Sequence, residues 1–138
     1  MSRGVVLSAI LGDSRLQARG FNEDNVCVAY DKEQRPSDQM FMVLRYGTQS
    51  VDPAIQRGPR DLVIWVHLYR EFSTDYAHID DVIVVLDDVL LNIIDTAGDD
   101  GFAVTQIDAG DKSGDFKDDT YQTLCRSTSF KVLSRAIV

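Results

Sequence analysis

Cysteine and histidine, the usual protein ligands of structural zinc, are scarce in this 138-residue sequence, with two of each. The two cysteines, Cys27 and Cys125, lie in apolar, strand-like surroundings, and no C-x-x-C motif or Cys/His cluster accompanies them. These surroundings and the lack of a recognisable secretory signal predict two buried, reduced thiols. The scarcity of ligands also argues against a structural zinc site, and we expect no metal ligands among these residues.

Motifs that mark common enzyme classes are also missing. No serine or cysteine stands in a G-x-S-x-G motif, and the chain has neither a Walker phosphate loop nor a G-x-G-x-x-G motif. His67 falls in the middle of an expected strand, and His78 falls on an expected helix, three residues before Asp81. We therefore expect no catalytic residue, no cofactor and a protein that is not an enzyme.

Long apolar runs are absent as well. A helix that crosses a bilayer needs about 20 consecutive apolar residues. The most apolar stretch, residues 82–94, is interrupted by Asp87, Asp88 and Asn92. We expect no membrane partner.

What the sequence does contain is acidic residues, in one block. The net charge is −8. Residues 71–120 hold fourteen acids and two bases, a balance of −12, and the rest of the chain holds eight acids and twelve bases, a balance of +4. Such a block disfavours binding of a phosphate backbone. It suits either a solvated acidic face or head-to-tail pairing between copies of the chain.

Hydrophobic periodicity predicts one α+β domain over residues 1–138, with a mostly antiparallel sheet of about five strands packed against two helices. The element order is α-β-β-β-α-β-β. Alternating positions of the third strand are apolar on both faces, so we expect this strand to be central and covered on both sides. The expected helices are residues 3–18 and 73–97, and the expected strands are residues 25–30, 40–46, 62–69, 102–107 and 121–133.

The second expected helix has two contrasting faces. Ser73 is the expected N-cap and Gly98 the expected stop. Apolar residues at helical spacing predict a stripe that packs on the sheet: Ile79, Ile83, Leu86, Leu90 and Ile93. The same helix carries no base. It carries several acids outside the apolar stripe, among them Asp80, Asp81, Asp87, Asp88 and Asp95. We expect that these acids cannot all be neutralised locally, and that some of their charge faces either a neighbour's arginines or a lumen.

Two connecting segments stand out. Residues 47–60 form an unusually long connection between neighbouring strands, and they contain Val51, Ile55, Arg57 and Arg60. We expect a protruding loop or arm that contacts another subunit or a partner, although a loop without such a role fits the sequence too. Residues 111–119 resemble a calcium loop but lack its closing glutamate, which favours a turn and leaves divalent-ion binding open.

Taken together, several segments resemble the tail terminator proteins of long-tailed, non-contractile phages, most of all those of phages that infect actinobacteria. The segments are MFMVLRYG, then RDLVIWVHLYREFSTDYAHIDDVIVVLDDVL, then the loop GDKSGDFKDDTY before the last strand. The most specific part is a strand ending in VIWVH that runs into a helix beginning near a D-Y-x-x-I signature, here Asp75, Tyr76 and Ile79. The resemblance covers nearly the whole chain.

The resemblance implies a structural protein of the virion. It implies a homo-hexameric ring at the tail-neck junction, assembled in the host cytoplasm, that caps the head-proximal end of the tail tube and ends its polymerisation. The implied partners are other copies of the chain, the major tail tube protein and head-completion proteins, with DNA only as cargo that passes through the lumen.

Two other interpretations remain at this point. The chain could be another neck protein, for head closure or head-to-tail joining. It could also be a small acidic inhibitor that mimics DNA, which would be a discrete monomer or dimer rather than a ring.

Overall fold

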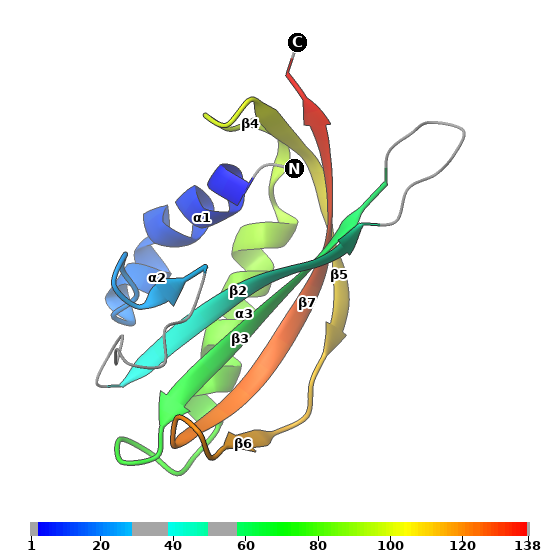
Figure 1. Cartoon of the computed structure of the whole chain (residues 1–138). Coiled ribbons are helices and arrows are strands. Elements are labelled where there is room, and N and C mark those ends of the chain that lie inside the picture. The colour runs from blue at the N-terminus through cyan, green and yellow to red at the C-terminus, as the bar shows by residue number, and fades with distance from the viewer. Residues whose placement is uncertain (1–2, 29–38, 50–57, 138) are drawn as a thin grey trace.

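The computed structural model describes residues 3–28, 39–49 and 58–137. In these residues the chain forms one curled, mixed sheet with helices against one of its faces (Figure 1). The helices are α1 (Arg3–Gly12), α2 (Ser14–Ala18) and α3 (Ala77–Leu91). The strands are β1 (Val26–Cys27), β2 (Met40–Gln49), β3 (Arg60–Tyr69), β4 (Ile94–Ala97), β5 (Phe102–Lys112), β6 (Phe116–Asp118) and β7 (Thr123–Ala136).

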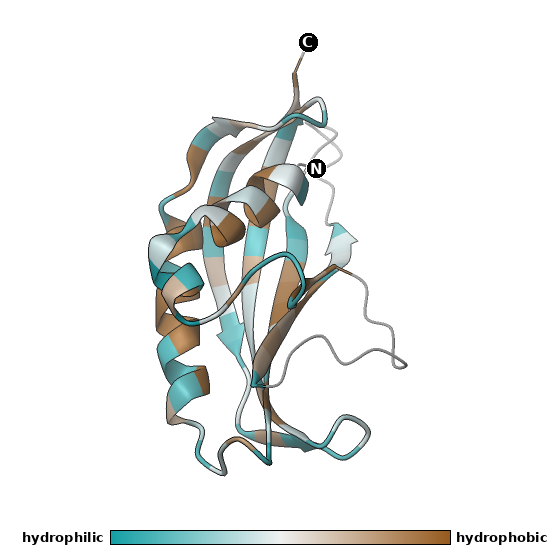
Figure 2. Ribbon diagram, turned by 90° about the vertical axis from the view of Figure 1, so that its left-hand side faces the viewer, coloured by the Kyte–Doolittle hydropathy of each residue, from teal (hydrophilic) through white to brown (hydrophobic). Residues whose placement is uncertain are grey.

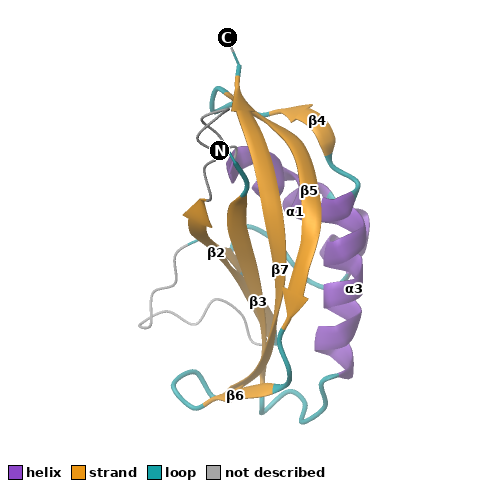
Figure 3. Ribbon diagram, turned by 90° about the vertical axis from the view of Figure 1, so that its right-hand side faces the viewer, coloured by secondary structure: helices purple, strands orange, loops and turns teal. Residues whose placement is uncertain are grey.

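The strand order across the sheet is β1-β2-β3-β7-β5-β4, and β6 pairs with β7 beyond the end of β5. β1 pairs with β2 in parallel, and the other pairings are antiparallel. β3 and β7 form the centre of the sheet, with ten pairs in continuous register from Arg60↔Val132 to Tyr69↔Thr123. β4 and β6 lie at opposite ends of the molecule (Figures 1 and 3).

The predicted five-stranded, mostly antiparallel sheet with two helices is wrong, although the broader α+β class fits. The described residues contain seven strands and three helices. The two additional strands, β4 and β6, come from segments expected to be helix or loop. β4 occupies the end of the expected second helix, and β6 lies within the expected loop before the last strand.

The expected second helix is shorter at both ends. Tyr76, not Ser73, occupies the N-cap position, and the Ser73 hydroxyl accepts a hydrogen bond from the backbone N–H of Asp75. The helix ends at Leu91 with Asn92 as C-cap, and Ile94 then begins a strand that pairs with β5. The apolar spacing continues through Ile93, so periodicity alone could not show that hydrogen bonding to β5 replaces the last helical turn.

The expected first helix is interrupted at Asp13. The Asp13 carboxylate accepts hydrogen bonds from the backbone N–H groups of Arg15 (2.9 Å) and Leu16 (3.1 Å), so it caps a new helix. Leu16 is thereby turned into the core, where it is fully buried.

The core lies between the helices and one face of the sheet. The predicted stripe on α3 is confirmed as buried: Ile79, Ile83, Leu86, Leu90 and Ile93 are each at most 9% exposed. Alternate residues of β3 form the other side of this layer, and they are fully buried: Leu62, Ile64, Val66 and Leu68. The apolar surfaces of α1 and α3 turn towards the sheet (Figure 2).

Among the described residues, no helix lies on the opposite face of the sheet (Figure 3). The other alternate residues of β3 lie here, and Val63 and Trp65 are only partly buried. Further along the same face, His67 and Tyr69 are each 6% exposed, so the expectation that β3 is covered on both sides holds near β6 and fails at Val63 and Trp65. This uncovered face positions the candidate site.

Candidate functional site: a groove on the uncovered face of the sheet

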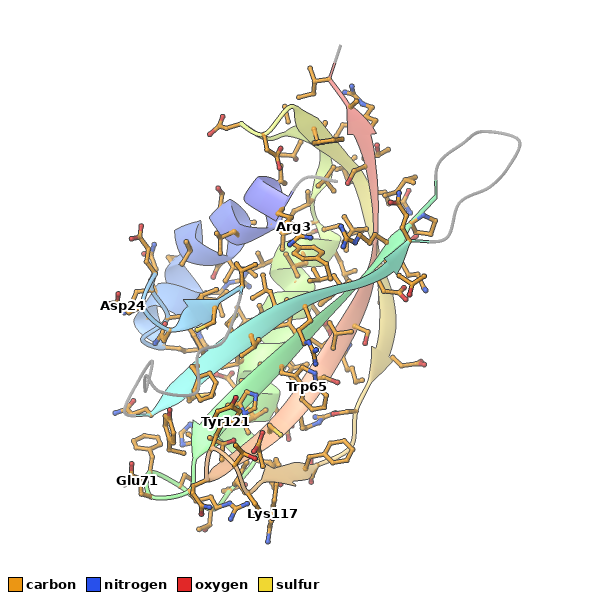
Figure 4. All side chains as sticks on the ribbon, viewed as in Figure 1. Arg3, Asp24, Trp65, Glu71, Lys117 and Tyr121 are labelled. Carbon is orange, nitrogen blue, oxygen red and sulfur yellow. The ribbon has the colours of Figure 1, made fainter. Side chains whose placement is uncertain are left out.

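A groove of about 630 Å³ lies on the uncovered face, near β6. Three neighbouring strands supply its floor, because Val43, Trp65, His67 and Cys125 occupy facing positions in β2, β3 and β7. Phe116 of β6 packs edge-on against Trp65, with ring centroids 6.0 Å apart. Trp65, Tyr121 and Lys117 lie in the same half of the molecule (Figure 4). The lining therefore combines aromatic and aliphatic side chains with charged ones at Arg45, Lys117, Asp118 and Asp119.

His67 is held rigidly in this floor. Its Nδ1 is 2.9 Å from the Thr123 hydroxyl, and its ring stacks on Phe41 with centroids 4.6 Å apart and planes within 2°. The ring of Tyr121 meets it edge-on. Burial lowers the pKa of His67 to about 4, so the ring is neutral at physiological pH. A neutral, fixed imidazole offers hydrogen bonding rather than charge.

Cys125 lies directly across from His67 in the β3–β7 pairing. Burial raises the pKa of its thiol to about 11. A nucleophilic Cys–His pair needs a depressed thiol pKa and a protonated partner. Both shifts here run the other way, so the groove brings histidine, cysteine and threonine together without activating a nucleophile. His78, by contrast, is exposed on α3 and contacts the ring of Phe72.

The charged residues that line the groove are two bases and two acids, so their formal charges cancel, but only the acids have local partners among the residues described. Asp119 accepts a hydrogen bond from Arg70 at 2.9 Å, and Asp118 accepts the backbone N–H groups of the following turn. Arg45 and Lys117 also line the groove, and in the described part of the chain neither makes an ion pair. The groove therefore suits an apolar partner that carries negative charge.

The four acids of the predicted face that lie on α3 have local partners, so most of this charge is paired within the chain. α2 supplies one pair of cations: Arg15 binds Asp88 at 2.6 Å, and Arg19 binds Asp81 through two nitrogens and lowers the pKa of that carboxyl. The sheet supplies the other pair, since Arg126 binds Asp80 at 2.6 Å and Lys112 binds Asp87 at 2.8 Å. Helix α3 thus carries no base but is bracketed by bases from α2, β5 and β7.

Asp95, the fifth acid of that group, is not on the helix. It is an exposed residue of β4 with a φ of 45°, a left-handed conformation that Asp tolerates better than most residues. It makes no ion pair with the described residues. Negative charge without a local partner therefore remains at the start of β4.

The expected arm at 47–60 is partly regular structure. Residues 47–49 extend β2, and Arg60 begins β3, paired with Gln49 across a register shift. Arg60 lies over the ring of Tyr46 and donates from its Nε to the Gly47 carbonyl at 3.1 Å. Val51, Ile55 and Arg57 lie outside the described residues, so their part in an interface stays a prediction.

The segment expected to be a turn, residues 111–119, instead continues two strands. Asp111 and Lys112 end β5, and β6 follows at 116–118. Within the described ranges, no group of three or more His, Cys, Asp or Glu side chains is arranged to hold a metal ion. In the same residues, no helix combines the length and apolar character that a membrane crossing requires.

Sequence reasoning missed the groove itself. The signal available was the second alternating set in β3, with Trp65 and His67 at successive positions of one face. No protein-family model matches the chain, and a search of curated proteins finds no match.

Proposed function

We propose that this protein is a structural subunit of a phage tail, which assembles into a hexameric ring that caps the head-proximal end of the tail tube.

 The ring ends tube polymerisation and offers a surface to head-completion proteins, and DNA passes through its lumen as cargo. Its location would then be the tail-neck junction of the virion.

The observation that carries the proposal is the uncovered sheet face with its aromatic groove. A groove that exposes aromatic rings beside charged residues on a small protein is typical of a surface that another protein covers. Trp65 is partly buried and Phe116 is 51% exposed, so both rings present apolar area to a partner. A chain that builds a ring needs such a surface on every copy.

Two further observations favour an assembly protein over the alternatives. The pKa shifts of His67 and Cys125 leave the groove without an activated nucleophile, which disfavours acyl-transfer chemistry. Ion pairs with α2 and the sheet compensate four acids of α3, which weakens the case for a helix that imitates the phosphates of DNA. The resemblance to tail terminators supplies the specific role.

Two measurements test the proposal. Electron microscopy of the pure protein should show rings of uniform diameter, and native mass spectrometry should give six copies of the chain. The reading frames beside the gene should include a tail tube protein. A discrete monomer or dimer together with flanking genes unrelated to tails would contradict the proposal and favour an inhibitor.

A further inference from the structure

We infer that the groove of one copy receives the α3–β4 corner of another copy, which we define as Leu91, Ile94 and Asp95. This inference deepens the proposed function, on which it rests, by naming the two surfaces of this chain that meet in the ring. The pairing is heterologous, because the groove and the corner are different surfaces of the same chain.

The corner exposes large apolar side chains. Ile94 is 67% exposed and Leu91 is 37% exposed, although both are large hydrophobic residues. All four residues of β4 are exposed, and within the described residues β4 pairs with β5 alone. The groove of about 630 Å³ has room for several side chains, so both apolar residues could enter it together.

The charges of the two surfaces are complementary. Asp95 stands beside Ile94 and makes no ion pair with the described residues, and Arg45 and Lys117 in the groove make none with them either. The two acids of the groove already have partners, since Asp119 binds Arg70 and Asp118 accepts two backbone N–H groups. Val84 on α3 is as exposed as Ile94, but it has no unpaired acid beside it. Its acidic neighbours Asp81 and Asp88 are already paired with arginines of α2.

The positions of the two surfaces exclude a contact within one molecule. β4 and β6 lie at opposite ends of the sheet (Figures 1 and 3), and the groove lies beside β6. Each copy therefore keeps one unused groove and one unused corner after a single contact. Repetition of that contact closes a ring when the rotation between copies permits it.

The test uses one variant for each surface. The groove variant carries Arg45→Glu and Lys117→Glu, and the corner variant carries Ile94→Ser and Asp95→Asn, since Asn tolerates the left-handed conformation. The control is Val84→Ser, because Val84 and Ile94 are both 67% exposed. Circular dichroism and melting curves identify any variant that fails to fold, and Lys117→Glu alone then replaces the groove variant.

Analytical ultracentrifugation over a concentration series gives the readout. We expect the wild type and Val84→Ser to self-associate equally, and each surface variant to raise the apparent dissociation constant at least about tenfold. A mixture of the groove and corner variants retains one intact contact. It should form a 1:1 pair that does not grow further.

Three results would overturn the inference. They are a wild type that stays monomeric at millimolar concentration, surface variants that associate like the wild type, and a mixture that contains only monomers. In the second case the chain still assembles, so the proposed ring stands while this interface fails. If the wild type stays monomeric, this interface fails, and the proposed function is then tested separately by measuring the length of tail tubes assembled with the protein.

Discussion

Leu86 offers the sharpest test of how the helical layer stabilises the fold. It is fully buried on the face of α3 that packs against the sheet. Leu86→Ala removes three carbon atoms, which at about 0.8 kcal/mol each corresponds to roughly 2.4 kcal/mol of transfer free energy. The cavity left behind adds to this cost, so the free energy of unfolding should fall by about 2–5 kcal/mol.

Urea denaturation followed by circular dichroism measures this loss directly. The matched control is Val84→Ala on the same helix, because Val84 is 67% exposed and its truncation should change stability by less than about 0.5 kcal/mol. Equal effects of the two substitutions, or a loss below about 1 kcal/mol for Leu86→Ala, would show that the α3 stripe is not a principal contact of the core.

Three further predictions concern single groups. Asp13→Ala removes the cap of α2 and should lower the free energy of unfolding by about 0.5–2 kcal/mol in urea denaturation. Asp13→Asn should keep most of this stability, because Asn also caps helices, and equal losses for the two variants would refute the capping role. Because the folded-state pKa of His67 is about 4, below its unfolded value, protonation favours unfolding as pH falls from about 6.5 towards 4, at a cost on the order of 3 kcal/mol. His67→Asn should flatten the stability profile between pH 7 and 5, and an unchanged profile would contradict the buried neutral ring. Cys125, with a pKa of about 11, should react with a maleimide about a hundredfold more slowly than a free thiol, and rapid labelling of native protein would contradict its burial.

Periodicity in the sequence located the layers of the fold better than their edges. The α3 stripe and the alternation of β3 report burial directly, and the structure confirms the burial of both. The predicted ends of helices and strands were wrong where pairing with a distant strand decides the conformation. Ile94 and Thr96 belong to β4 because β5 offers them partners, and residues 116–118 are a strand because β7 is long enough to pair with them.

The ion pairs of α3 could not be predicted from the sequence for the same reason. The sequence shows that α3 has acids and no bases, and it places arginines at 15, 19 and 126 far from them. Only the fold brings Arg15 to Asp88 across 73 residues of chain. The groove depends on the same kind of information, because Val43, Trp65 and Cys125 become neighbours through strand register alone.

Tube length tests the central claim most directly. We expect a tail tube protein to be encoded beside this chain, and that protein would be polymerised with and without the pure chain and the products measured by electron microscopy. The account predicts shorter tubes that carry a ring at one end when the protein is present. Tubes of unchanged length with bare ends would contradict it.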